Sequence, residues 1–386
     1  METYYIHASR FFLPGGIEQE GYLPIIDGKF GVYTKELTDK DAKVVDYTGK
    51  WIAPGLVDTH IHGYKGHDVM DNDFEGIKVM SDGLLSCGVT SFLPTTLTSD
   101  VETLNSVSKT IGDHYKEVTG AKIQGIYFEG PFFTEEHKGA QNPKFFGDPN
   151  LDTFHHWQEL SGGLIKKIAI APERDGAAAF TQQLVQEGVT VSLGHSSATL
   201  EEAKEVVSAG ASVFVHAYNG MSGLNHREPG MVGAAMTTKD TFAELICDGH
   251  HVHPQAAEAL MDVKGRDQVA LITDCMRAGG MPNGDYQLGE FPVVVEGGTA
   301  RLKDSGSLAG SILQLFDAVK NVTDWSIATV EEAIRMASIV PAQSCNIDDK
   351  CGSLQSGHDA DFLVIDPELN LNETYLDGVS VYKKDN

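Results

Sequence analysis

Eight apolar runs of strand length, separated by stretches of helical period, constrain the fold of this chain more than any other feature. Short apolar runs are typical of strands buried on both faces, and the amphipathic stretches between them are typical of crossover helices in a parallel sheet. The runs cover residues 52–58, 89–93, 122–128, 168–171, 190–193, 212–215, 242–246 and 269–273. The pattern predicts an α/β fold, a (β/α)8 barrel of the TIM type.

Local signals support the helices of this barrel. Thr199 with Glu202 and Thr329 with Glu332 have the spacing of a capping box at a helix start. Gly88 closes an apolar stripe at the position where helices favour glycine. An open doubly-wound sheet is the alternative architecture, but its G-x-G-x-x-G phosphate loop is missing after the first run.

The two ends of the chain have a different sequence pattern from the middle. Residues 1–50 and 345–386 contain brief apolar groups separated by glycines, which is typical of short strands and turns. We expect them to form a small β-sandwich domain built from both chain ends, with the barrel at 51–344. A glycine-rich insertion at 278–303, with a short β run inside it, follows the eighth apolar run.

Composition excludes several classes of partner. With 29 Lys and Arg against 55 Asp and Glu, the formal charge is −26, whereas a nucleic acid or an anionic membrane requires a basic face. The five cysteines form no C-x-x-C pair, which favours a reducing compartment over a disulfide framework. The first residues lack the pattern of a signal peptide, and no run is long enough to span a membrane. We therefore expect a cytoplasmic protein.

Ligand-type side chains follow six of the eight apolar runs. Barrel enzymes build their sites at the carboxyl ends of the strands, so these side chains are expected to meet on one face. His60 and His62, two residues apart on a strand, point to the same side. A lone histidine after a strand is usually a turn residue, but six sets together predict a metal site. The residues are His60 and His62, Glu129, His195, His216, Asp248 with His250 and His251, and Asp274.

This set predicts metal-assisted hydrolysis of a carbonyl compound. Nitrogen and oxygen donors without a nearby thiolate leave Zn²⁺, Fe²⁺ and Mn²⁺ open, with one or two ions bound. Glu129 has two carboxylate oxygens and could bridge two ions. Asp274 is the candidate general base, which takes a proton from an activated water and passes it to the leaving group. A role for Asp274 as a further ligand is compatible with this. The candidate ligands are His60, His62, Glu129, His195 and His216.

Several motifs resemble the amidohydrolase superfamily. APGLVDTHIH at 53–62 and GSLQSGHDADF at 352–362 are general marks of that superfamily. More specific motifs are similar to those of the N-acetylglucosamine-6-phosphate deacetylase family within it. These are EGPF at 129–132, GHS at 194–196, HAYNGM at 216–221, DGHHV at 248–252 and SLAGS at 307–311.

The resemblance implies hydrolysis of the acetamide of N-acetylglucosamine 6-phosphate, to glucosamine 6-phosphate and acetate. It supports Glu129, His195 and His216 as the metal site and Asp274 as the catalytic acid and base. Some members of the family lack the equivalent of His60 and His62, and for this pair we expect a second metal position that shares Glu129, with a structural role as the alternative. The resemblance also implies a homodimer with the phosphate site near the interface. The substrate-binding residues implied are Ala140, Asn219, Gly220, Arg227, His251, Ser307, Leu308 and Ala309.

Two other functions remain open at this point. A related amidohydrolase, such as a D-aminoacylase, a dihydroorotase or an adenine deaminase, would share the general motifs but would not need Arg227 for a phosphate. A non-catalytic scaffold would be expected to lose ligands or the base, and this chain retains all of them.

Overall fold

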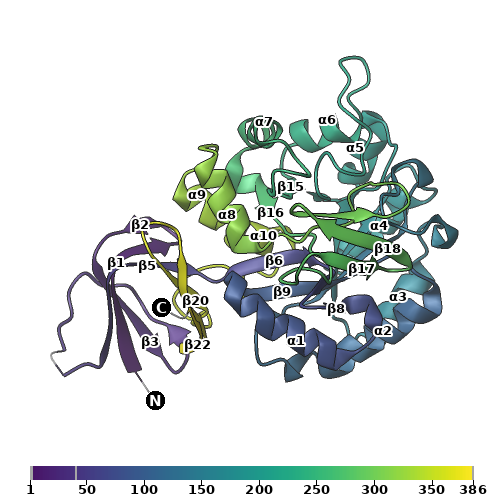
Figure 1. Ribbon diagram of the computed structural model, residues 1–386. Coiled ribbons are helices and arrows are strands. Elements are labelled where there is room, and N and C mark those ends of the chain that lie inside the picture. Colours follow the sequence, from purple (N-terminus) through teal and green to yellow (C-terminus); the bar gives the residue numbers. More distant parts are fainter. Residues whose placement is uncertain (1–2, 40, 385–386) are drawn as a thin grey trace.

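The computed structural model describes residues 3–39 and 41–384, and its larger part is a barrel of parallel strands surrounded by helices (Figure 1). Within those residues, neighbouring strands pair in sequence order around the barrel. A parallel bridge between Ile61 and Cys275 joins the first strand to the segment that follows the last one. The strands are β6 (Leu56–Ile61), β9 (Val89–Thr96), β11 (Ile126–Phe132), β12 (Ile165–Ile170), β13 (Thr190–Leu193), β14 (Val213–Phe214), β15 (Phe242–Leu245) and β16 (Val269–Leu271). The predicted (β/α)8 barrel is confirmed.

The first apolar run differs from its prediction. Residues 52–58 were expected to form one strand, but the structure divides them between β5 (Val44–Pro54) and β6. Pro54 has no N–H to continue the ladder. At Gly55 a Cβ would lie 2.0 Å from Thr90 Oγ1, so the chain passes too close to β9 for any side chain. The chain therefore leaves the small domain at Pro54 and enters the barrel one residue later.

Helices cover the outside of the barrel, with their apolar stripes against the strands (Figure 1). Both predicted capping boxes are present, at Thr199 with Glu202 and at Thr329 with Glu332. Gly88 has φ of 73°, as its predicted position at a helix end requires. The α-helices are α1 (Phe74–Leu84), α2 (Val101–His114), α3 (Leu151–Leu160), α4 (Ala177–Gln186), α5 (Leu200–Ser208), α6 (Gly230–Thr237), α7 (Pro254–Lys264), α8 (Leu315–Asp324), α9 (Val330–Met336) and α10 (Ile339–Ser344).

The small domain is one sheet built from both chain ends, with β20 paired to β5 and β5 to β1. The sheet curls over its own core. Phe30 in β4 and Phe362 in β20 are far apart in strand order, yet their ring centroids lie 6.1 Å apart. Its strands are β1 (Thr3–Leu13), β2 (Gly16–Glu18), β3 (Gly21–Ile26), β4 (Lys29–Phe30), β5, β20 (Phe362–Ile365), β21 (Leu371–Leu376) and β22 (Val379–Lys383).

The glycine-rich insertion forms a three-stranded antiparallel sheet, β17 (Gly284–Leu288), β18 (Phe291–Glu296) and β19 (Thr299–Leu302). Leu288 from this sheet packs in one cluster with Leu97 and Met276, which follow barrel strands β9 and β16. The insertion therefore covers the carboxyl ends of the barrel strands. The shorter strands are β7 (Gly63–Tyr64), β8 (His67–Asp68) and β10 (Lys122–Ile123).

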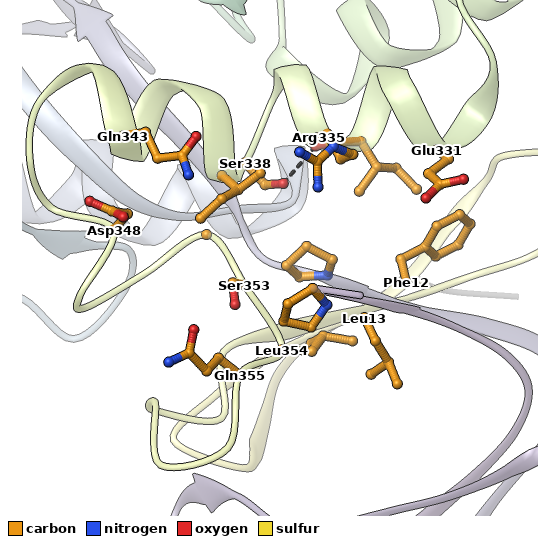
Figure 2. Close-up of a pocket in the computed structure, with 15 residues that line it drawn as sticks. Phe12, Leu13, Glu331, Arg335, Ser338, Gln343, Asp348, Ser353, Leu354 and Gln355 are labelled. Carbon is orange, nitrogen blue, oxygen red and sulfur yellow. Dashed lines mark hydrogen bonds between the residues drawn. The ribbon is translucent and has the colours of Figure 1, made fainter. Parts of the chain in front are cut away.

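A cavity of about 240 Å³ lies where the small domain meets the barrel (Figure 2). Phe12 and Leu13 of β1 line one side, and Glu331 and Arg335 of α9 line the other. Pro54, just before β6 begins, also lines it, so this cavity is at the end of the barrel opposite the carboxyl ends of the strands. None of the helices that the structure describes is both long and apolar enough to cross a bilayer.

Candidate metal centre and active site

A second cavity, of about 430 Å³, opens at the carboxyl ends of the barrel strands. His62, Glu129 and Asp274 form part of its wall, together with His195 and His216. These residues come from strands β6, β11, β13, β14 and β16 or from the residues just after them. The side chains predicted after these five strands therefore meet in one place. Of the set predicted after β15, His251 lines the same cavity, whereas Asp248 and His250 line a different one.

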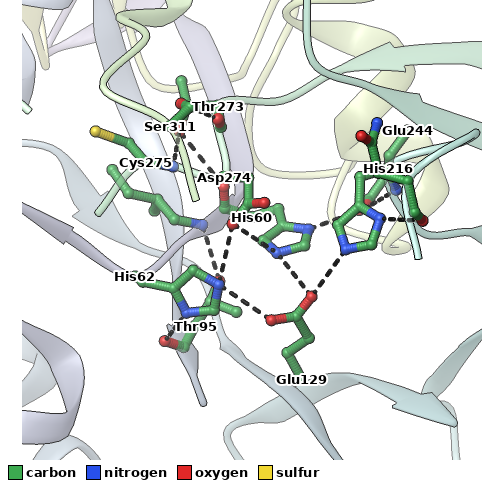
Figure 3. Close-up of polar contacts among 12 residues, drawn as sticks. His60, His62, Thr95, Glu129, His216, Glu244, Thr273, Asp274, Cys275 and Ser311 are labelled. Atoms are coloured by element: carbon green, nitrogen blue, oxygen red, sulfur yellow. Dashed lines mark hydrogen bonds and ion pairs between the residues drawn. The ribbon is translucent and has the colours of Figure 1, made fainter. Parts of the chain in front are cut away.

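Glu129 contacts the histidines of both ligand groups (Figure 3). Its Oε1 lies 3.3 Å from His60 Nε2 and from His195 Nε2, and 3.2 Å from His216 Nε2. Its Oε2 lies 3.1 Å from His62 Nε2. A single carboxylate thus contacts four imidazoles, which is the geometry expected of a group that bridges two ligand sets.

Asp274 lies beside the pair of histidines from β6. Its Oδ1 is 3.2 Å from His62 Nε2 and 3.5 Å from His60 Nε2. The Asp274 N–H donates to the His60 carbonyl at 2.9 Å, which fixes the backbone of the two strand ends relative to each other. Asp274 is therefore placed both to ligate an ion with His60 and His62 and to exchange a proton with a molecule in the cavity.

All four histidines are held through Nδ1, which leaves Nε2 directed at Glu129. The Nδ1 atoms of three of them face backbone carbonyls: His62 that of Thr95 (3.2 Å), His195 that of His137 (2.9 Å) and His216 that of Asn219 (3.1 Å). Hydrogen bonding of the distal nitrogen fixes the tautomer and ring orientation of a metal-ligating histidine. The exception is His60, whose Nδ1 is 3.0 Å from a carboxylate oxygen of Glu244.

The backbone is strained where three of these residues leave their strands. His195, His216 and Asp274 have φ of 47°, 25° and 48°, values that residues with a side chain rarely adopt. Such conformations cost about 1–3 kcal/mol each and are found mainly at functional sites. Gly220 shows the crowding around them, since a Cβ there would lie 2.9 Å from His195 Nδ1. The strained backbone lowers the stability of the fold, and it directs these side chains into the cavity.

The carboxylates favour positive charge at the centre of the site. Burial acts to lower the pKa of His60, but Glu129, Glu244 and Asp274 outweigh it and raise that pKa to about 9. Burial acts to raise the pKa of Glu129, but the surrounding imidazoles hold that pKa well below its usual range. A buried point that stabilises a proton in this way also stabilises a divalent cation.

The donor set fits such a cation. His60 Nε2 is buried and makes no well-aligned hydrogen bond, although carboxylate oxygens of Glu129 and Asp274 lie 3.3 and 3.5 Å away, so its lone pair is available to an ion. In the described residues, two groups each bring three ligand atoms within 4.8 Å of one another. The nitrogen and carboxylate donors suit Zn²⁺, Fe²⁺ or Mn²⁺. The groups are His60 with His62 and Asp274, and Glu129 with His195 and His216.

Most of the predicted substrate residues line the same cavity, and two do not. Ala309 is fully buried in the cluster beneath the insertion, behind the cavity wall. Arg227 is exposed on the loop that precedes α6, and this loop projects from the barrel (Figure 1). The predicted residues on the wall are Ala140, Asn219, Gly220, His251, Ser307 and Leu308.

Sequence reasoning missed four residues that the structure places in or next to the site. Gln141 Nε2 donates to Glu129 Oε2 at 2.7 Å, and Arg301 of β19 lines the cavity. Glu244 and Lys167 form an ion pair beneath it, with both side chains fully buried. A charged residue inside an apolar strand was the available signal for this pair, because burial of an unpaired charge is prohibitively costly.

Comparisons with known proteins agree with this geometry. The family model for "Amidohydrolase family" matches residues 51–384. An N-acetylglucosamine-6-phosphate deacetylase from Vibrio furnissii is 40% identical over 86% of this chain and 83% of its own. An N-acetylgalactosamine-6-phosphate deacetylase from Escherichia coli O157:H7 is 38% identical over 97% of this chain and 98% of its own. A solved structure of a mutant N-acetyl-D-glucosamine-6-phosphate deacetylase from Mycobacterium smegmatis, in complex with N-acetyl-D-glucosamine-6-phosphate, superposes with a TM-score of 0.92. It is 26% identical and covers 99% of this chain and 100% of that one.

Proposed function

Because the chain belongs to the amidohydrolase family, we propose that it hydrolyses the acetamide of N-acetylglucosamine 6-phosphate to glucosamine 6-phosphate and acetate. One observation carries this proposal: two three-residue ligand groups lie side by side at the carboxyl ends of the strands, and five of their six residues line one cavity. The relatives that match over most of the chain carry the names of deacetylases for N-acetyl amino-sugar phosphates.

In this proposal Glu129, His195 and His216 hold one divalent ion, and His60 with His62 holds a second that shares Glu129. When bound, such an ion supplies Lewis acidity, which polarises a carbonyl and lowers the pKa of water from 15.7 to about 7. The metal is Zn²⁺, Fe²⁺ or Mn²⁺. The chain itself supplies the ligands, their fixed orientation and a buried, polar cavity.

Asp274 is the proposed proton carrier. Its carboxylate accepts the proton of the attacking water and then delivers it to the sugar nitrogen, which leaves as an amine while acetate is released. Burial acts to raise the pKa of Asp274, but His60 and His62 lower it below its usual value, so the group is ionised and able to accept a proton. Its backbone is held by the hydrogen bond to His60, so the carboxylate keeps its position through both transfers.

His251 is the proposed partner of a sugar hydroxyl or of the phosphate. Asp248 holds it, with Oδ2 2.6 Å from His251 Nδ1 and Oδ1 accepting the His251 backbone N–H at 2.8 Å. The Nε2 of His251 is then the nitrogen left for a ligand in the cavity. Ser307 and Leu308 line the same cavity and complete the proposed substrate site.

Acetate release tests this function. Purified protein supplied with Zn²⁺, Fe²⁺ or Mn²⁺ is incubated with N-acetylglucosamine 6-phosphate, with free N-acetylglucosamine and with N-acetylgalactosamine 6-phosphate. We expect kcat/KM for the phosphorylated glucosamine to exceed that for the free sugar by at least about 10²-fold, because a site built for a charged group rejects a ligand without it. A second candidate function is deacetylation of N-acetylgalactosamine 6-phosphate, which the 38% identity to an enzyme of that name favours.

The proposal includes a homodimer in which Arg227 reaches the phosphate bound by the neighbouring subunit. This would explain a phosphate-binding arginine on an exposed, projecting loop outside the cavity of its own chain. Its planar guanidinium suits bidentate phosphate binding. We expect Arg227→Ala to raise KM for the phosphorylated sugar at least about tenfold, with little change for the free sugar, because a charged hydrogen bond to the phosphate is lost.

Two variants make this measurement decisive. His226→Ala removes the neighbouring exposed side chain and should leave KM unchanged. Arg301→Ala removes the arginine that lines the cavity within the same subunit. An unchanged KM for Arg227→Ala, together with a raised KM for Arg301→Ala, would contradict the role of Arg227 and place phosphate binding within one chain. Size-exclusion chromatography with light scattering measures whether the protein is a dimer.

The proposal also covers the binding partner and the cellular location of the protein. A formal charge of −26 disfavours binding to nucleic acid or to an anionic membrane, and we propose the small-molecule substrate as the partner. We propose a cytoplasmic location, which agrees with cysteines that are all buried and unpaired.

A further inference from the structure

Two buried charges lie directly beneath the candidate metal centre. Lys167 of β12 and Glu244 of β15 are both fully buried inside the barrel, and their side chains form an ion pair. The Lys167 ammonium also lies 4.0 Å from the centre of the Tyr127 ring. An apolar pair of similar volume would fill a barrel interior as well or better, because two charges must be stripped of water. The burial of this ion pair therefore indicates that it has a role other than filling the barrel interior.

Glu244 has two further contacts, and both are to candidate ligands. Its Oε2 lies 3.0 Å from His60 Nδ1 and accepts the backbone N–H of His216 at 3.3 Å (Figure 3). One carboxylate thus touches a residue of each ligand group, the ring in one case and the main chain in the other.

His60 depends on this carboxylate in a way that the other histidines do not. The Nδ1 atoms of His62, His195 and His216 face backbone carbonyls, which the fold supplies whatever the side chains are. His60 has Glu244 instead, and its own Nε2 has no hydrogen-bond partner. The orientation of the His60 ring is therefore set by a side chain, which a substitution can replace, and not by the main chain.

We propose that Glu244, with its charge balanced by Lys167, is a positioning residue that enables the group of His60, His62 and Asp274 to hold a second metal ion. By accepting the Nδ1 proton of His60, it directs the Nε2 lone pair at the space between Glu129 and Asp274. Lys167 pairs with this carboxylate and holds it in place. The inference rests on the proposed metal-dependent function but concerns metal binding alone.

The test counts metal ions. Wild-type protein and Glu244→Gln are stripped of metal, reloaded with Zn²⁺ or Mn²⁺ against a competing chelator, and analysed for metal per chain. We expect two ions in the wild type. In Glu244→Gln we expect the weaker ion to bind about 10–100-fold less tightly, the usual cost of losing such a partner, while the ion at Glu129, His195 and His216 is retained.

Two further variants distinguish a role of Glu244 in orienting His60 from a general effect on folding. Glu373→Gln is the matched control, because Glu373 is a buried carboxylate paired with Lys383 in the small domain. It should bind both ions as the wild type does. Lys167→Met combined with Glu244→Gln removes both buried charges together, so it is expected to fold even where Glu244→Gln alone does not. The double variant should also lose the second ion.

The metal-binding results test the role of Glu244, and the acetate-release results test the proposed function. Two ions bound with wild-type affinity in Glu244→Gln, or in the double variant if the single one fails to fold, would overturn the inference. A wild-type chain that binds only one ion would overturn it as well. Acetate release is measured separately on the wild type, so a protein that binds two ions but releases no acetate would refute the proposed function and leave the role of Glu244 standing.

Discussion

Replacing Asp274 by asparagine is expected to lower kcat for acetate release by about 10³-fold, because an amide cannot accept the proton of the attacking water or return it to the amine. Asparagine keeps the shape of the side chain and an oxygen beside His62, so the fold and the ion at Glu129, His195 and His216 should be retained. Steady-state acetate release and metal analysis on the same sample measure both quantities.

The control for this variant is Asp359→Asn, which removes a carboxylate that pairs with Lys29 and Lys122 outside the cavity. It should leave kcat unchanged. If Asp274→Asn retained more than a tenth of the wild-type kcat, Asp274 would not be the proton carrier. A fall in kcat that could be restored fully by adding metal would instead assign Asp274 a role as ligand alone.

His195→Ala is expected to reduce acetate release to background, because the group of Glu129, His195 and His216 then has too few ligands to hold its ion. The matched comparison is His60→Ala combined with His62→Ala. This pair should lower the metal content by one ion per chain and leave the first ion in place, since Glu129, His195 and His216 are intact.

These two variants distinguish the ligand groups from each other. Substantial activity in His195→Ala would show that its group is not the essential site. Unchanged metal content in the double His60 and His62 variant would show that this pair is structural. The Nε2 atoms of all four histidines lie within 3.3 Å of Glu129, so the arrangement by itself places both groups at the same carboxylate.

The barrel could be predicted because its signals are local. The run at 190–193 is strand β13 with the same bounds, and the run at 242–246 is β15 to within one residue. The capping boxes at Thr199 and Thr329 depend on residues three positions apart, so they can be identified from sequence alone. Glu129, His195, His216 and Asp274 were found by the rule that barrel sites lie at strand ends.

What could not be predicted depends on contacts between distant strands. Glu244 and Lys167 are 77 residues apart, and Gln141 reaches Glu129 from a loop, so no spacing rule connects them. Each looks like an ordinary polar residue until the fold buries it. The break between two strands at Pro54 was not predicted, because an apolar run continues across it.

The most direct test of the whole account is acetate release from N-acetylglucosamine 6-phosphate by one preparation in two states. One portion carries its full complement of metal, and the other has been stripped by a chelator and dialysed. The account predicts acetate and glucosamine 6-phosphate in equal amounts from the loaded portion, none above background from the stripped portion, and recovery when a divalent metal is restored. Equal rates in the two portions, or no acetate from a fully loaded, folded protein, would contradict it.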